Sequence, residues 1–262
     1  MTTQTIQTRG ADIVLDDVGQ GEPALVFLHY WGGSARTWEP VVALLSASHR
    51  AVAINQRGWG GSQVTDGRYD LETLADDVID VVEALGIGRY VLAGHSMGGK
   101  VAQIVAGRRP PGLAGLVLVA PAPPTPMQVP PEVRAGMLTS YQSREGVAEA
   151  LKLLAGPGLD DARREQVIGD TLRGDADAKR SWTDHGMSLD VGAALVGIEL
   201  PVEIVLAEHD RVERESVLRP IFARLLPGAA IRTVPGAGHL IPLETPQAVA
   251  EACGRILAQT DR

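Results

Sequence analysis

The sequence predicts an α/β protein, in which a mostly parallel sheet is flanked by helices and interrupted by a small helical insertion. Two observations predict this class. Short apolar runs alternate with longer amphipathic runs, which is the pattern of strands and helices around a parallel sheet. One of these runs, Leu113–Ala120, is apolar except for a single glycine, as expected for a strand that helices cover on both faces.

The predicted elements follow one another along the chain. Two antiparallel strands are expected before a turn-rich segment at 19–23. Further strands are expected at 24–29, 50–55, 90–93, 113–120, 201–207 and 229–234, and the main helices at 37–46, 71–85, 100–108 and 245–257. The helix at 71–85 has apolar residues that recur with a period close to 3.6. Asp70 is its expected N-cap and Gly86 its expected C-cap.

The segment 122–197 breaks this rhythm. It opens with a proline-rich stretch, continues as charged helical sequence without a strand-like run, and is too long for a loop in a compact domain. We therefore expect one core domain made of residues 1–121 and 198–262, a size usual for a single α/β sheet. Residues 122–197 are expected to form a helical cap over one end of that sheet.

Composition and charge exclude several classes of partner and site. A net charge of −8 argues against nucleic acid or an anionic membrane surface as the main partner. The single cysteine, Cys253, excludes an internal disulfide and any zinc site built from cysteines. The N-terminal residues lack the apolar core of a signal peptide, and no apolar run reaches the length of a membrane span. We expect a soluble cytoplasmic protein whose partner is a small-molecule substrate; the sequence does not predict its oligomeric state.

The strongest chemical signal is the segment from Gly94 to Gly98, which matches the pattern G-x-S-x-G. In this motif a strand turns sharply into a helix and leaves the serine at the apex in a strained backbone conformation. Here the motif lies between a predicted strand and a predicted helix, which is the context it requires. Ser96 is therefore the candidate nucleophile, and the amide of Met97 is a candidate oxyanion donor at the helix N-terminus.

Four motifs in order make the chain resemble the α/β-hydrolase family along nearly its whole length. The segment 27–34 resembles the family's His-Gly loop, and 56–62 is similar to its Arg-Gly-x-Gly-x-Ser loop. The segments 208–210 and 236–239 fall where the family keeps its acid and its histidine, in the family's order of serine, acid and histidine. The resemblance implies an α/β-hydrolase fold with a cap at 122–197.

A serine nucleophile needs a base, and that base needs a carboxylate behind it. Of the six histidines, His239 is the best candidate, because it lies in a glycine-rich loop after the last strand. Asp210 follows the strand at 201–207 and matches the family's acid position, with Glu208 as the alternative acid. By the same resemblance His29 is structural, and Glu244 is expected to be a structural partner near the final loop.

The resemblance also implies a second oxyanion donor, the amide of Trp31. In this chain Tyr30 replaces the glycine that usually follows the loop histidine. The predicted apolar pocket is lined by Tyr30, Met127 and Trp182. The alternative to a pocket lining, for most of the apolar cap residues, is that they only pack the cap against the sheet.

These features predict an enzyme that needs no cofactor and no metal. A serine at position 96 argues against the family branches that use an alkylated carboxylate, and the loop at 58–61 does not have the G-x-G-x-x-G spacing of a dinucleotide site. The favoured function is a carboxylesterase acting on esters or lactones through an acyl-enzyme. The alternatives are a cofactor-free haloperoxidase or perhydrolase, a carbon–carbon bond hydrolase and, from another class, a small-ligand receptor on the same fold.

Overall fold

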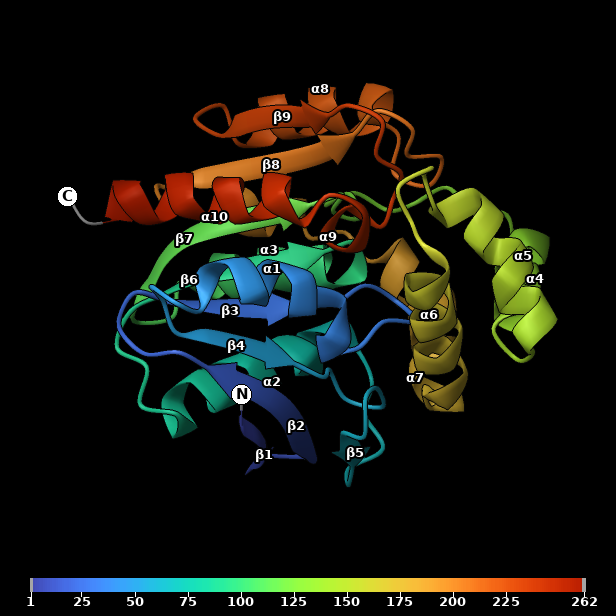
Figure 1. Ribbon diagram of the computed structural model, residues 1–262, viewed down its shortest axis with the longest axis horizontal. Helices are drawn as coiled ribbons and strands as arrows, with labels where there is room; N and C mark the ends of the chain where they lie inside the picture. Colours follow the sequence, from blue (N-terminus) through green and yellow to red (C-terminus); the bar gives the residue numbers. More distant parts are fainter. Residues whose placement is uncertain (1, 261–262) are drawn as a thin grey trace.

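The computed structural model describes residues 2–260, and within them a nine-stranded sheet carries helices on both faces (Figure 1). Its strands are β1 (Thr2–Gln7), β2 (Ala11–Val18), β3 (Ala24–Leu28), β4 (Ala51–Ile54), β5 (Gln63–Val64), β6 (Tyr90–His95), β7 (Leu113–Val119), β8 (Val202–Ala207) and β9 (Ala230–Val234). The order is β1-β2-β4-β3-β6-β7-β8-β9, with β5 paired to β2. All pairs from β4 to β9 are parallel, and those made by β2 are antiparallel. The predicted mostly parallel sheet is confirmed.

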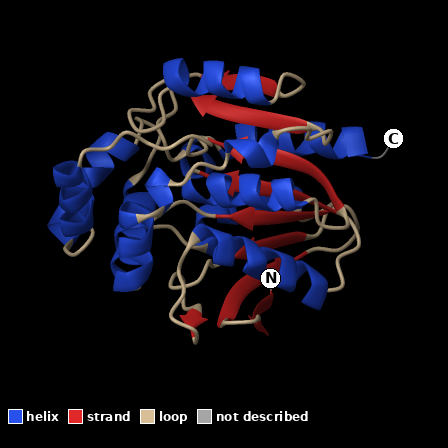
Figure 2. Ribbon diagram, turned by 180° about the vertical axis from the view of Figure 1, so that it is seen from behind, coloured by secondary structure: helices blue, strands red, loops and turns tan. Residues whose placement is uncertain are grey.

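Helices cover the two faces of this sheet as separate layers (Figures 1 and 2). One face carries α1 (Glu39–Leu45), α10 (Pro246–Thr260), the 3-10 turn η1 (Ala35–Trp38) and the short α9 (Ile241–Glu244). The other carries α2 (Leu71–Ala84), α3 (Met97–Arg108) and α8 (Glu215–Leu225). Strand β3 contributes to both layers, because successive side chains of a strand point to opposite faces: Phe27 packs with the first set and Val26 with the second.

The segment between β7 and β8 is helical throughout its regular parts. It contains α4 (Pro131–Ser140), α5 (Arg144–Leu154), α6 (Asp161–Arg173), α7 (Ala176–Asp184), η2 (Gly186–Ser188) and η3 (Gly192–Leu195). The arrowheads of β3, β4 and β8 point toward α4 to α7 in Figure 1, so these helices lie beyond the carboxyl edge of the sheet. We call residues 122–197 the cap.

Some predicted boundaries differ from the structure at helix ends. The last helix, predicted at 245–257, is α10, which begins at Pro246 and extends to Thr260. The short α9 precedes it and ends before Thr245, because a residue before proline is disfavoured in helical geometry. The helix predicted from residue 100 begins at Met97, directly after the turn. The predicted N-cap is confirmed: Asp70 accepts a hydrogen bond of 2.9 Å from the N–H of Thr73.

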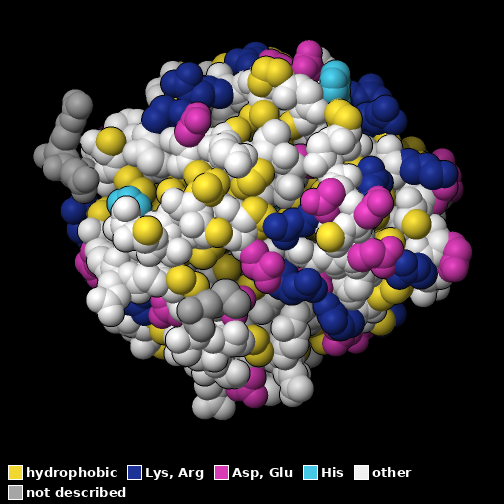
Figure 3. Space-filling model, viewed as in Figure 1, with side chains coloured by type: hydrophobic (Ala, Val, Ile, Leu, Met, Phe, Trp, Pro, Cys, Tyr) yellow, Lys and Arg dark blue, Asp and Glu magenta, His cyan; other side chains and the backbone are white. Residues whose placement is uncertain are grey.

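Charged side chains of both signs lie interspersed over the face of the molecule seen in Figure 3. Within residues 2–260 no helix combines the length and the apolar character needed to cross a membrane.

Candidate active site

The turn between β6 and α3 has the geometry that its motif predicts. Ser96 lies at the apex with φ 53° and ψ −115°. This backbone conformation is energetically unfavourable for any residue that has a side chain. The glycines around it are required by close backbone contacts. A Cβ on Gly94 would lie 2.3 Å from the carbonyl oxygen of Gly98, and one on Gly98 would lie 2.5 Å from that of Leu28. The strained turn is therefore possible only with small residues on both sides of the serine.

His239 and Asp210 form a buried hydrogen-bonded pair at the same edge of the sheet. His239 Nδ1 lies 2.7 Å from Asp210 Oδ2, and the other oxygen, Oδ1, accepts bonds of 2.8 Å from the N–H groups of Val212 and Glu213. Burial alone would raise the pKa of Asp210, but the neighbouring His239 and these N–H donors outweigh it and hold the pKa below its usual value. The ionised carboxylate accepts from Nδ1–H, which leaves Nε2 as the basic nitrogen.

The histidine of this pair lies beside the strained turn. The ring of His239 is 5.2 Å from the ring of His95, the residue before Ser96. His95 Nε2 is 2.8 Å from the carbonyl oxygen of His239, and because a carbonyl only accepts, this nitrogen carries the proton. Ser96, Asp210 and His239 are each at least nine-tenths buried. The structure thus brings the three predicted residues to one edge of the sheet from three separate loops.

The alternative acid, Glu208, is placed differently. Its side chain is 55% exposed, and its Oε2 accepts a hydrogen bond of 2.8 Å from the N–H of Gly236. The carboxylate that contacts the histidine is that of Asp210.

The loop after β3 presents the second predicted oxyanion donor. Among the described residues neither the N–H of Trp31 nor that of Met97 donates to a protein acceptor. His29 orients the peptide group between Tyr30 and Trp31. Its Nε2 accepts from the N–H of Gln56 at 3.1 Å, so its Nδ1 carries the proton and donates to the carbonyl oxygen of Tyr30 at 2.7 Å. Since that carbonyl and the Trp31 N–H belong to one planar trans peptide, fixing the carbonyl also fixes the N–H.

His29 is completely buried, and this burial lowers its pKa to about 4. It is therefore a neutral positioning group, in agreement with its predicted structural role.

The cap holds the same loop from the other side. The ring of Tyr141 stacks on the indole of Trp31 with centroids 4.0 Å apart, and its hydroxyl donates to the Trp31 carbonyl at 3.4 Å. Thr171 Oγ1 donates to the carbonyl of Gly32 at 2.9 Å, and Asp170 Oδ2 accepts from Ser34 Oγ at 2.8 Å. No local motif predicts these contacts, because each joins residues more than 100 positions apart.

The three predicted pocket residues lie in different surroundings. The ring of Tyr30 is buried against that of His95 at 5.1 Å. Trp182 is buried on α7, where its ring packs against Gly186. Met127 is half-buried and its N–H donates to the carbonyl of Met187. All three belong to or pack on the core cluster beneath the cap, and their contact with a substrate stays a prediction.

Two buried charged side chains near this site were not predicted. Burial, together with the charge of Asp210, raises the pKa of Glu213 well above its ordinary range. Lys100, four residues after Ser96 on α3, is fully buried, and this lowers its pKa to about 8. The helical spacing from Ser96 was the only signal that could have drawn attention to Lys100.

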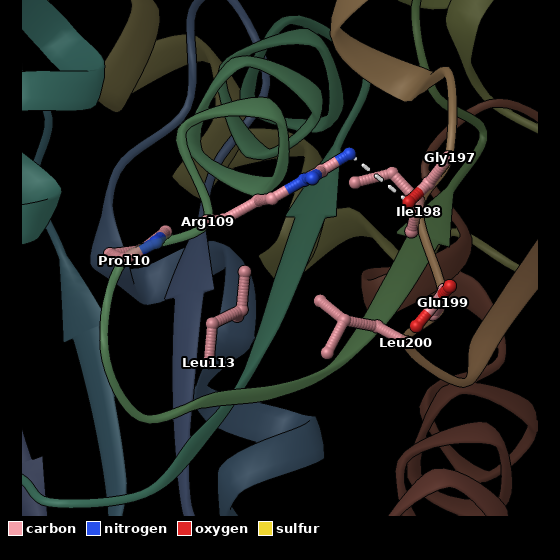
Figure 4. A pocket seen from close by; sticks show the side chains of 7 residues that line it. All are labelled: Arg109, Pro110, Leu113, Gly197, Ile198, Glu199 and Leu200. Atoms are coloured by element: carbon pink, nitrogen blue, oxygen red, sulfur yellow. Dashed lines mark hydrogen bonds between the residues drawn. The ribbon is translucent and has the colours of Figure 1, made fainter.

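The cavity drawn in Figure 4 lies elsewhere. Its volume is about 340 Å³, and its lining residues are Arg109, Pro110, Leu113, Gly197, Ile198, Glu199 and Leu200. These residues follow α3, begin β7 or precede β8, so the cavity opens at the amino edge of the sheet. Arg109 donates from there to the carbonyls of Val196 and Gly197. It shares no residue with the pair of His239 and Asp210.

Known proteins resemble this chain over nearly all of its length. The model of the alpha/beta hydrolase family matches residues 25–252. The bifunctional esterase/perhydrolase DCH of Acinetobacter calcoaceticus is 30% identical over 254 residues, covering 89% of this chain and 91% of that protein. The non-heme chloroperoxidase CPO-A1 of Kitasatospora aureofaciens is 29% identical over 254 residues, covering 89% and 90%.

Solved structures agree with the fold. A thermophilic esterase from Thermogutta terrifontis superposes with a TM-score of 0.85 at 24% identity, over 99% of each chain. An esterase from Exiguobacterium antarcticum has a TM-score of 0.88 at 19% identity, over 100% of each chain. At these identities the likeness shows the fold, and the predicted α/β-hydrolase fold is confirmed.

Proposed function

Because the chain belongs to the alpha/beta hydrolase family, we propose that it hydrolyses carboxylic esters or lactones by acyl transfer to Ser96. The observation that carries the proposal is the hydrogen bond of 2.7 Å between His239 and Asp210, beside a serine held at φ 53°. A hydroxyl is a weak nucleophile alone, and this arrangement supplies the base and the carboxylate that orients it.

In the first half of the reaction Ser96 Oγ attacks the acyl carbon, and His239 Nε2 accepts the serine proton. The proton passes to the leaving alkoxide when the ester bond breaks, which leaves an acyl group on Ser96. Water then attacks this acyl-enzyme with His239 again as base, and the carboxylic acid is released. Asp210 keeps its charge throughout and stabilises the imidazolium that forms in each step.

The oxyanion of each tetrahedral intermediate is stabilised by the N–H groups of Met97 and Trp31. The first lies at the N-terminus of α3, where backbone donors and the helix dipole favour negative charge. The second is oriented by the bond from His29 to the carbonyl of Tyr30. One such donor is worth about 3–4 kcal/mol of transition-state stabilisation.

Perhydrolysis is a second candidate, favoured by the relatives whose names include perhydrolase and chloroperoxidase. The same acyl-enzyme would form, and hydrogen peroxide instead of water would attack it to release a peracid. The two functions differ only in the acceptor, so adding peroxide to the ester assay and measuring peracid distinguishes them.

The test is hydrolysis of p-nitrophenyl esters of graded chain length by the wild type and Ser96→Ala. We expect the variant to lose at least about 10⁴-fold in kcat, because the nucleophile of the covalent step is absent. Ser143→Ala is the matched control, since that serine caps α5 on the cap surface and should leave kcat unchanged. Hydrolysis retained in Ser96→Ala would contradict the proposal.

A further inference from the structure

The loop that carries His239 is packed directly against the backbone of the cap. The N–H of His239 itself donates to the carbonyl of Leu154 at 2.8 Å. Gly238 and Gly156 face each other so closely that a Cβ on either would lie within 2.5 Å of a backbone nitrogen of the other. Two backbones can approach in this way only with glycine on both sides.

A single carboxylate joins the two backbones. Glu244 Oε2 accepts hydrogen bonds from the N–H of Gly156 at 3.0 Å and from that of Gly238 at 2.9 Å. Its other oxygen, Oε1, accepts from the N–H of Leu240 at 3.1 Å. Two of these donors are the neighbours of His239 on either side, and the third belongs to the connection between α5 and α6 in the cap.

We propose that Glu244 is a positioning residue that couples the cap to the base. It holds His239 in its catalytic position only while residues 154–156 of the cap are packed against the loop of His239. Bonds from N–H groups to an ionised carboxylate are short and stronger than neutral ones. They hold the N–H groups of the residues on either side of His239, and the N–H of His239 itself donates to Leu154, so together these bonds fix the origin of its side chain. The inference rests on the proposed function, since it concerns the base of that reaction.

The geometry makes the charge, and not only the size, of Glu244 important. Both oxygens are occupied as acceptors, and Glu244→Gln replaces one of them with an NH₂ group that can only donate. In either orientation the amide therefore faces at least one N–H donor. Shape is preserved, but at least one of the three contacts becomes repulsive.

The experiment compares Glu244→Gln and Glu244→Ala with Glu22→Gln. Glu22 also accepts a bond from a backbone N–H, that of Gly88 at 2.7 Å, but at the opposite edge of the sheet. We expect kcat to fall about tenfold in Glu244→Gln and about 100-fold in Glu244→Ala, as is usual when a catalytic group is misplaced by about 1 Å. KM should change much less, and Glu22→Gln should keep the wild-type kcat.

Gly156→Ala tests the cap side of the same contact. The added Cβ would lie 2.3 Å from Glu244 Oε2 and 2.5 Å from the nitrogen of Gly238, so the cap segment must move away. We expect this variant to lose kcat as Glu244→Gln does, although it changes neither the base loop nor the carboxylate.

A second measurement does not depend on turnover. The Nδ1 proton of His239, in its bond to Asp210, is expected to give a low-field proton NMR signal. That signal should shift or disappear in Glu244→Ala and persist in Glu22→Gln. A purely structural role would lower the unfolding midpoint but leave both the signal and kcat of the folded enzyme unchanged, and this result would overturn the inference. If the wild type cleaves no ester, the proposed function fails while the NMR signal still decides the role of Glu244.

Discussion

The two edges of the sheet differ in how their polar groups are arranged: the candidate site lies at one edge, and the cavity of Figure 4 lies at the other. At the carboxyl edge Ser96, His239 and Asp210 are almost fully buried, and backbone and side-chain bonds orient the histidine and the acid. At the amino edge a cavity of about 340 Å³ is lined largely by apolar side chains, with Arg109 and Glu199 at its margin. This cavity therefore lies away from the oriented polar groups.

The difference follows from the parallel sheet. In such sheets ligands bind beyond the carboxyl ends of the strands, where loops and helix N-termini converge. At the amino edge helices end instead, as α3 does at Arg108, where Arg109 with φ 50° forms the C-cap. Carbonyl groups gather there, and those of Val196 and Gly197 are already occupied by Arg109. Variants at both edges can test how far this contrast reaches.

The largest effect in this comparison is expected from Asp210→Asn. The amide oxygen would keep the bonds from the N–H groups of Val212 and Glu213, so the NH₂ group would face His239 Nδ1. This favours the tautomer in which Nε2 is protonated and no longer basic. We expect kcat for ester hydrolysis to fall about 10⁴-fold, with KM little changed. Glu208→Gln, which removes the alternative acid, should cost less than about tenfold. A larger loss in Glu208→Gln than in Asp210→Asn would reverse the assignment of the acid.

A smaller effect is expected from His29→Gln, which removes the ring that orients the oxyanion peptide. If the Trp31 N–H loses its alignment, kcat should fall about 10- to 100-fold, less than for loss of the acid. The control is Gln103→Ala, which also removes a buried polar side chain, in this case one on α3. It measures how much kcat falls through loss of packing alone. An unchanged kcat in His29→Gln would show that the loop is aligned by the cap alone.

The same variant is expected to change the pH dependence of stability. The pKa of His29 is lowered to about 4, so between pH 6.5 and 4 the unfolded chain binds a proton that the folded chain does not. The contribution of His29 to the free energy of unfolding is therefore fully present above pH 6.5. It is lost as the pH decreases, and the loss reaches about 3 kcal/mol at pH 4. Urea unfolding from pH 8 to 4 should show a shallower decline in His29→Gln. An identical decline would mean that other groups, such as buried His95, account for it.

The smallest effect is expected at the amino edge. Glu199→Gln changes the charge of the cavity in Figure 4 without touching any residue of the candidate site. We expect kcat and KM to stay within about twofold of the wild type, as for most surface substitutions. A pronounced change in KM would show that this cavity takes part in substrate binding and would remove the contrast between the edges.

Much of the fold and the candidate site could be predicted, because the informative features are local. Alternation of apolar runs indicates strands and helices, and the helix at 71–84 begins at its predicted cap. The turn at Ser96 needs glycines at fixed short spacings, so five consecutive residues identify it. The boundaries that differed, such as the start of α3 at Met97 instead of residue 100, depend on one or two residues whose effect on a helix end is hard to place from a pattern.

The contacts that organise the site could not be predicted, because they join distant residues through backbone atoms that every residue has. Glu244 accepts from Gly156, Thr171 donates to the carbonyl of Gly32, and His95 donates to the carbonyl of His239. Backbone donors and acceptors are the same at almost every position, so the sequence does not indicate which of them form hydrogen bonds with each other. Close packing of the folded chain decides this.

The sequence by itself thus determined the class of fold and the candidate nucleophile, acid and base, since each depends on residue type and order. The tertiary structure decided how the cap meets the loops that carry Trp31 and His239, which carboxylate contacts His239, and where the cavity in Figure 4 opens. These depend on distances between segments far apart in the chain, which packing sets only after the sheet has formed.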